Sequence, residues 1–231
     1  TTDEKPRWVL GSLGPGTKLP TLGHTTYELL KQAYETASTG LIEGGSDALL
    51  IETTQDLLQA KSAVNGARDA ITKSKKDIVL IAQVTVETTG TMLMGSEIGA
   101  ALNALEPLGI DLIGLNCATG PAEMSEHLRV LSKGSTVGIS VMPNAGLPVL
   151  GENGAHYPLS PAELAKSLKQ FVIDYKVNLV GGCCGTTPEH MGEVVKQLQG
   201  TKLATREVVR EIGASSLYQF APFRQQNTYL S

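Results

Sequence analysis

The sequence contains no apolar run that approaches the roughly 20 residues a membrane-spanning helix requires. Its first seven residues, Thr1 to Arg7, also lack the apolar segment of a secretory signal. No block of basic residues is present, and 19 Lys plus Arg against 23 Asp plus Glu give a net charge of -4. A run of phosphates would therefore find no complementary surface. These absences argue against membrane and nucleic-acid partners and predict a cytoplasmic protein.

Cysteine is scarce as well, with three residues in 231. Three cysteines are too few for the disulfide framework of a small secreted protein, and an odd number cannot all form pairs. We therefore expect the cysteines to serve through reactivity or metal binding. Apolar residues, by contrast, make up 41% of the chain, which is enough to build the core of one large globular domain.

Short β-rich apolar runs alternate along the chain with longer segments of helical periodicity, and this alternation is typical of a parallel α/β sheet. The predicted strands are 8–13, 48–52, 78–84, 111–116, 137–141 and 178–182. The predicted helices are 27–43, 56–74, 96–108, 122–131, 161–175 and 188–198. Two helix starts carry strong signals, because Ser160-Pro-Ala-Glu163 reads as a capping box with proline at the first helical position and Thr187-Pro188 repeats the cap and proline.

Six strand–helix units fit either an open doubly wound sheet or a (β/α)8 TIM barrel of which only six units are evident. An open sheet gathers its polar residues at one switch point. Here glycine-rich and polar residues follow almost every strand, as at 14–16, 52–54, 117–121, 143–146 and 183–188. A barrel brings all these strand ends into one ring, where barrel enzymes place their chemistry, so we predict the barrel.

Residues 200–231 differ from the rest, because four of the ten aromatic residues fall there: Tyr218, Phe220, Phe223 and Tyr229. One reading is a mobile tail. The other is an extension that docks on the barrel or on a neighbouring module, since exposed aromatic surface is costly.

The three cysteines lie at two predicted strand ends, Cys117 after one strand and the pair Cys183-Cys184 after the last. Consecutive cysteines suit an ordinary disulfide poorly, because their Cα atoms lie only about 3.8 Å apart. Three thiolates with an open fourth position are the ligand set of a catalytic zinc ion. Ordinary buried cysteines and a redox-active Cys183-Cys184 pair are the alternatives. His190 could close the shell, but it lies inside a predicted helix, where a capping or solvated role is favoured.

Three segments carry a family resemblance: 114–121 (Gly-Leu-Asn-Cys-Ala-Thr-Gly-Pro), 143–148 (Pro-Asn-Ala-Gly-Leu-Pro) and above all 180–190 (Val-Gly-Gly-Cys-Cys-Gly-Thr-Thr-Pro-Glu-His). From about Arg7 to Leu198 the chain resembles the zinc-binding homocysteine methyltransferase family, and most closely its cobalamin-dependent members. Residues 200–231 resemble the connector that leads in those members to a folate-binding module. The implied organisation is a zinc- and homocysteine-binding barrel at 1–199 and an extension or inter-domain connector at 200–231.

The resemblance implies that Cys117, Cys183 and Cys184 hold zinc and that the homocysteine thiolate takes the fourth position. Methyl transfer to that sulfur yields methionine. The implied donor is methylcobalamin carried by another module, so folate- and cobalamin-binding modules are the expected partners besides homocysteine.

Three polar residues at predicted strand ends are candidates for substrate binding. Glu52 matches a family acid that holds the substrate amino group, although an acid in this place is often only a helix cap. Asn116 and Asn144 would either orient a ligand or brace a loop.

The chain departs from the family pattern in one respect, because the family barrel starts with two further strand–helix units, the first with a Phe-Asp-Gly-Ala-Met-Gly type motif, that nothing here matches. Either the chain is part of a longer polypeptide or those strands come from elsewhere. Two rival functions remain open. One is a stand-alone homocysteine methyltransferase that uses betaine or S-methylmethionine. The other is a non-catalytic scaffold in which zinc only stabilises the fold.

Overall fold

The computed structural model describes residues 6–151, 154–202, 205–208, 211–218 and 220–223. Within them, six strands form one parallel sheet in the order β1-β2-β3-β4-β5-β8. The strands are β1 (Leu10–Leu13), β2 (Ala48–Thr54), β3 (Val79–Val84), β4 (Leu112–Asn116), β5 (Gly138–Met142) and β8 (Leu179–Val180). The helices are α1 (Tyr27–Glu43), α2 (Leu57–Ser74), α3 (Ile98–Leu105), α4 (Pro121–Gly134), α5 (Pro161–Tyr175) and α6 (Pro188–Leu198).

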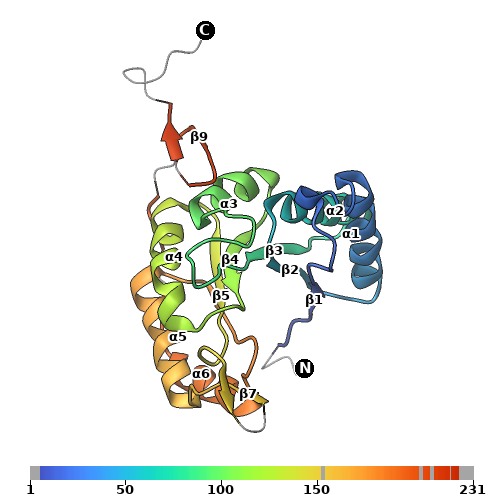
Figure 1. Ribbon diagram of the computed structural model, residues 1–231. Coiled ribbons are helices and arrows are strands. Elements are labelled where there is room, and N and C mark those ends of the chain that lie inside the picture. Colours follow the sequence, from blue (N-terminus) through green and yellow to red (C-terminus); the bar gives the residue numbers. More distant parts are fainter. Residues whose placement is uncertain (1–5, 152–153, 203–204, 209–210, 219, 224–231) are drawn as a thin grey trace.

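The order of the strands in the sheet follows their order in the chain, so the sheet has no switch point of the kind that defines a doubly wound fold. The sheet curves, and the helices cover its convex side (Figure 1). The six predicted units are thus confirmed as a half-barrel, consistent with part of a TIM barrel. All carboxyl ends of its parallel strands lie on one rim, which we call the mouth.

The core lies between the sheet and the helices. Alternate residues of each inner strand, such as Ile51, Ile113 and Ile139, are fully buried there. Facing them, α4 and α5 contribute Leu128, Leu131, Leu164 and Leu168, which are also fully buried. Burial of these aliphatic side chains stabilises the sheet and fixes which residues point to its concave side.

Side-chain caps explain where several helices begin. Asp56 Oδ1 accepts a hydrogen bond from Leu58 N–H at 2.8 Å at the start of α2. The predicted capping box of α5 is present, since Ser160 N–H donates to Glu163 Oε2 (2.9 Å) and Glu163 N–H donates to Ser160 Oγ (3.4 Å). At the start of α6 the N–H of Thr187 donates to Nδ1 of His190 (3.2 Å). The expected capping role of His190 is confirmed, and its ring is buried rather than solvated.

Three short elements were not predicted: a 3₁₀ turn at Pro20–Leu22, the hairpin β6–β7 (Val149–Gly151 and Gly154–His156), and the hairpin β9–β10 (Gly213–Ser215 and Phe220–Pro222). The end of the helix predicted over 96–108 is a separate 3₁₀ turn, Glu106–Leu108. The hairpin β9–β10 belongs to the aromatic tail, and β9 lies beside α3 at the opposite end of the molecule from β7 (Figure 1). The N–H of Glu97 donates to the carbonyl of Leu217 (2.9 Å), so the described part of the tail docks on the half-barrel. Tyr229 lies outside the described residues.

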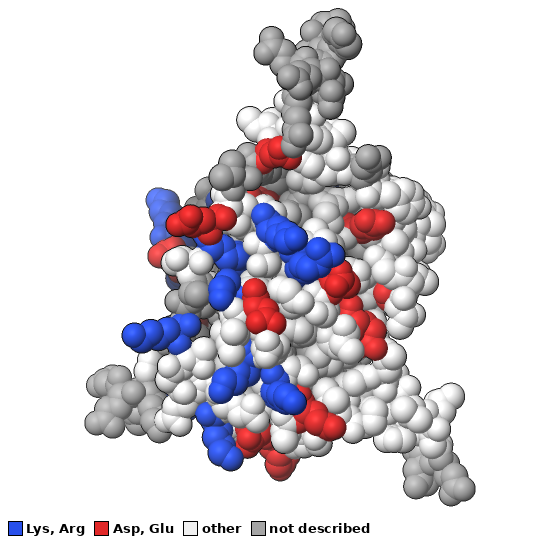
Figure 2. Space-filling view, turned by 90° about the vertical axis from the view of Figure 1, so that its left-hand side faces the viewer, with Lys and Arg blue, Asp and Glu red and all other residues white. Residues whose placement is uncertain are grey.

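Charged side chains of both signs are interspersed on the face that α4, α5 and α6 present to solvent (Figure 2). Two ion pairs join neighbouring turns within a helix, Arg129 with Glu126 on α4 and Lys196 with Glu193 on α6. Exposed pairs of this kind contribute little to stability. Among the described residues, no helix combines the length and the apolar character needed to cross a membrane.

Gly66 permits the close contact between α1 and α2, because a Cβ atom at this position would lie 2.4 Å from the carbonyl oxygen of Lys31. A Gly66→Ala substitution is expected to destabilise the fold by about 1–3 kcal/mol, since the backbone of α1 must move. Gly40, also helical, has open space around its Cα, so Gly40→Ala should stabilise by about 0.5–1 kcal/mol through helix propensity. Urea unfolding measures the free energy of unfolding of both variants relative to the parent chain. Changes of the same sign in the two variants would contradict this account of the α1–α2 contact.

Candidate metal centre

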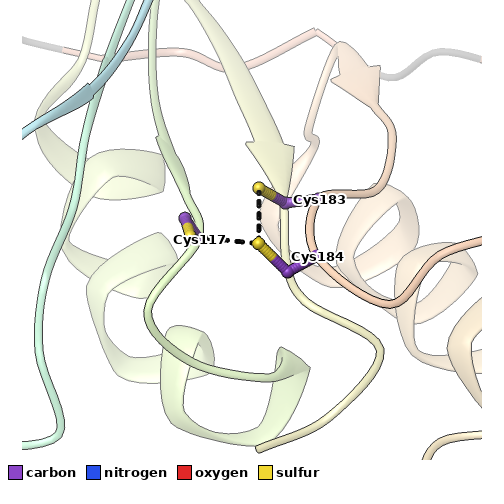
Figure 3. Close-up of side chains that lie close together, drawn as sticks. All are labelled: Cys117, Cys183 and Cys184. Atoms are coloured by element: carbon purple, nitrogen blue, oxygen red, sulfur yellow. Dashed lines mark hydrogen bonds between the residues drawn. The ribbon is translucent and has the colours of Figure 1, made fainter. Parts of the chain in front are cut away.

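The three cysteines meet at the mouth of the half-barrel (Figure 3). Cys117 directly follows β4, and Cys183 and Cys184 lie in the loop after β8. Backbone hydrogen bonds hold both segments against the end of β5, since Cys117 N–H donates to the carbonyl of Met142 (3.2 Å) and Cys183 N–H donates to that of Pro143 (2.9 Å). Cys117 has a left-handed φ of 62°, which is uncommon for a residue other than glycine and ends the strand abruptly.

The sulfur atoms have the spacing of metal ligands. Sγ of Cys184 lies 3.7 Å from Sγ of Cys117 and 3.9 Å from Sγ of Cys183, and all three lie within 4.8 Å of one another. Two sulfurs bound tetrahedrally to zinc at about 2.3 Å are about 3.8 Å apart, so the cluster fits one zinc ion with little movement. No other Cys, His, Asp or Glu of the described chain joins the group, and Cys184 is exposed. A fourth position therefore remains accessible from solvent.

The thiols strongly influence one another's protonation. The neighbouring Cys183 thiol lowers the pKa of Cys117 to about 6, with help from the N–H of Ala118, while burial opposes the shift. The same interaction, together with burial, raises the pKa of Cys183. These interactions favour the thiolate form of Cys117, and thiolate is the form that binds metal ions.

Asn116 links the cysteine cluster to Glu52. Its Nδ2 donates to Oγ1 of Thr53 (2.8 Å), lies 3.3 Å from Oε2 of Glu52 and lies 3.9 Å from Sγ of Cys183. Its Oδ1 accepts the N–H of Thr53 (2.7 Å). Asn116 is fully buried, and its two-point contact holds Thr53 in a left-handed conformation (φ 60°) that a β-branched residue rarely adopts. The structure thus brings Glu52 and Asn116 together beside Cys183.

Glu52 is partly exposed at the mouth. Its Oε1 accepts a short hydrogen bond from Ser12 Oγ, so each carboxylate oxygen has one donor from the protein. A carboxylate oxygen can accept more than one hydrogen bond, which leaves capacity for a ligand. In this structure Glu52 does not cap a helix, since Asp56 caps α2.

The sequence allowed two roles for Asn144, orienting a ligand or bracing a loop, and its contacts in the structure brace a loop. Its side chain is almost fully buried, and its Oδ1 accepts the N–H of Cys184 (3.1 Å). The carbonyl of Cys184 in turn accepts the N–H of Ala145 (2.9 Å). Asn144 therefore fixes the position of the cysteine pair relative to the loop after β5.

Sequence reasoning missed Ser12 and Thr53. Ser12 carries one signal, a polar side chain inside the otherwise apolar run that forms β1. Thr53 carries none, because its left-handed backbone depends on a partner 63 residues away.

Comparison with known proteins places this geometry in context. The family model described as homocysteine S-methyltransferase matches residues 1–198. A curated relative from Mycobacterium tuberculosis, named methionine synthase, is 59% identical over 98% of this chain, and one of the same name from Mycobacterium leprae is 57% identical over 100% of it. The chain spans about a fifth of the length of these relatives, 19% and 20%. These matches confirm the resemblance predicted from the sequence.

The solved structure of the apo form of the homocysteine methyltransferase MmuM from Escherichia coli superposes with a TM-score of 0.64 at 20% identity, over 82% of this chain and 63% of that one. Its metallated form gives a TM-score of 0.60 at 19% identity, over 82% and 61%. At this identity the likeness establishes the shared fold.

Proposed function

The chain belongs to the homocysteine S-methyltransferase family, and we propose that it binds one zinc ion through Cys117, Cys183 and Cys184 and transfers a methyl group to the thiol of homocysteine, giving methionine. The observation that carries the proposal is the cluster of three sulfurs within 4.8 Å, with no fourth ligand among the described residues. A structural zinc site is normally closed by four protein ligands, whereas a catalytic site keeps one position for substrate.

A neutral thiol attacks a methyl group poorly, and the thiolate is the competent nucleophile. Zinc in this site would supply one thing, a lower pKa for the substrate thiol that takes the open position. Three cysteine thiolates also carry more negative charge than zinc carries positive charge, so the site would have no net positive charge. The substrate sulfur thereby keeps its electron density for the attack.

The chain's own residues orient the substrate. Glu52 stands at the mouth with both carboxylate oxygens fixed, by Ser12 on one side and Asn116 on the other. In the proposal this carboxylate binds the substrate ammonium group, and Asn116 holds it at a set distance from Cys183. Asn144 keeps Cys184 in place through its backbone N–H and contributes to the binding site in this way.

The methyl donor in this proposal is methylcobalamin carried by another module. The length of the relatives supports it, because four fifths of each lies outside the matched part. Folate- and cobalamin-binding modules are the proposed partners, with residues 200–231 as the connector toward them. A methylcobalamin-dependence assay separates this proposal from a methyltransferase that uses betaine or S-methylmethionine.

Homocysteine binding to the zinc-loaded chain is expected to release close to one proton near pH 7. A free thiol has a pKa of about 8.5, so the substrate arrives protonated and loses its proton on reaching the metal. Calorimetry in two buffers of different ionisation enthalpy measures this number directly. Binding without proton release would favour the scaffold in which zinc only staples the fold.

A further inference from the structure

The two strands that carry the thiols are held very differently. β4, which leads to Cys117, is an inner strand with partners on both sides. β8, which leads to Cys183 and Cys184, is a two-residue strand whose register with β5 comprises Ser140↔Leu179 and Val141↔Val180. Both residues of β8 are partly exposed. Two of the three sulfurs therefore follow the shortest of the six strands described for the sheet.

The amino end of β8 is held by hydrogen bonds from Arg206, a residue of the segment 200–231. Asn178 pairs with Ile139 twice, through its own N–H to the carbonyl (2.8 Å) and through its Oδ1, which accepts the N–H of Ile139 (2.9 Å). Nη1 of Arg206 donates to that same Oδ1 (3.0 Å) and to the carbonyl of Lys176 (2.8 Å). Nη2 of Arg206 donates to the carbonyl of Val137, which directly precedes β5.

The position suits a guanidinium group. Lys176 is the C-cap of α5, where carbonyl groups lack helical partners and carry partial negative charge. The fixed fork of an arginine can donate to several acceptors at once, which a lysine cannot do with the same geometry. Arg206 thus ties together the end of α5, the start of β8 and the start of β5, at the pole opposite the mouth.

We propose that Arg206 is a positioning residue for the metal centre, and that it acts by anchoring strand β8 so that Cys183 and Cys184 stay within reach of Cys117. The inference rests on the proposed function for the metal. From Asn178 to Cys183 the chain runs along β5 and the loop after it, because the N–H groups of Asn178, Gly181 and Cys183 donate to the carbonyls of Ile139, Val141 and Pro143. Movement at the start of this stretch would therefore displace the sulfurs at its end. Arg206 belongs to residues 200–231, so this segment supports the metal centre from the pole opposite the mouth.

The test uses the full chain with Arg206→Met, which keeps an unbranched side chain and removes all donors. In the metal-free chain we expect hydrogen exchange to become at least tenfold faster at the amides of Gly181 and Cys183, which donate to Val141 and Pro143. The amides of β4 and of Cys117 should keep their exchange rates. In the zinc-loaded chain, capture by a chromogenic chelator should show zinc leaving about tenfold faster.

Arg129→Met is the matched control, because Arg129 bonds only to Glu126 on the outer surface of α4 in the contacts described for it. It should change neither exchange at β8 nor zinc release. For Arg206→Lys, the exchange rates at Gly181 and Cys183 and the rate of zinc release should lie between those of Arg206→Met and those of the parent chain. If Arg206→Met does not fold, Arg206→Lys takes its place in the test. Unchanged exchange at Gly181 and Cys183, or equal acceleration in β4, would overturn the proposal. A parent chain that binds no zinc would refute the proposed function instead, while the exchange data on the metal-free chain would still decide the anchoring role.

Discussion

Replacing Cys184 by alanine is expected to lower the zinc affinity of the chain by at least about a hundredfold, and the same holds for Cys117 and Cys183. Loss of a group that merely supports a metal ligand typically costs ten- to a hundredfold in affinity, and loss of a ligand itself should cost more. The sulfur spacing of 3.7 and 3.9 Å leaves no nearby substitute, because no other Cys, His, Asp or Glu in the described chain lies in the group. Metal content by mass spectrometry after dialysis against a weak chelator measures the effect.

A matched control separates loss of a ligand from damage to the loop. Thr186 braces the same loop, since its Oγ1 donates to the carbonyl of Cys183 (2.7 Å), but it offers no sulfur. Thr186→Val keeps its shape and should retain close to one zinc per chain. Full zinc occupancy in Cys184→Ala, or equal loss in Thr186→Val, would refute the three-cysteine site.

The convergence of the cysteines could be predicted from sequence because it depends on one topological rule. Parallel strands that follow one another place their carboxyl ends on one rim, so Cys117 and the pair Cys183-Cys184 had to face the same mouth once the strands before them were identified. Helix limits at Tyr27–Glu43 and Pro161–Tyr175 followed in the same way, from local periodicity and caps. These features depend on information within a few turns of chain.

Features set by distant partners could not be predicted. β8 is shorter than the expected 178–182, since its register with β5 covers only Leu179 and Val180. Asn116 connects Glu52 to the cysteine cluster through contacts with Thr53 and Glu52, which lie more than 60 residues away in the chain. Arg206 stood in a segment of no clear periodicity, and nothing local indicates that its side chain reaches β5. The sequence predicted the cysteine cluster but not the groups that hold it in place.

Glu52→Gln is expected to weaken homocysteine binding by about ten- to a hundredfold while zinc content stays unchanged. A hydrogen bond to a charged group is worth roughly 1.5–3 kcal/mol, and each 1.4 kcal/mol corresponds to about a factor of ten in affinity. The glutamine can keep the observed network, since its oxygen can accept from Asn116 and its amide can donate to the hydroxyl of Ser12. The substitution therefore removes the charge with little change of geometry.

Two comparisons isolate the contact between Glu52 and the substrate ammonium. 4-Mercaptobutyrate, which is homocysteine without its amino group, should bind the Glu52→Gln chain and the parent about equally, because it has no ammonium for the carboxylate to hold. Glu43→Gln changes an exposed acid at the end of α1 and should leave both ligands unaffected. Calorimetric titration of the zinc-loaded chains gives all the affinities. If Glu52→Gln weakens both thiols alike, the acid acts on the metal centre through Asn116 and Cys183 and not on the amino group, and if zinc is lost the acid belongs to the support of the metal site.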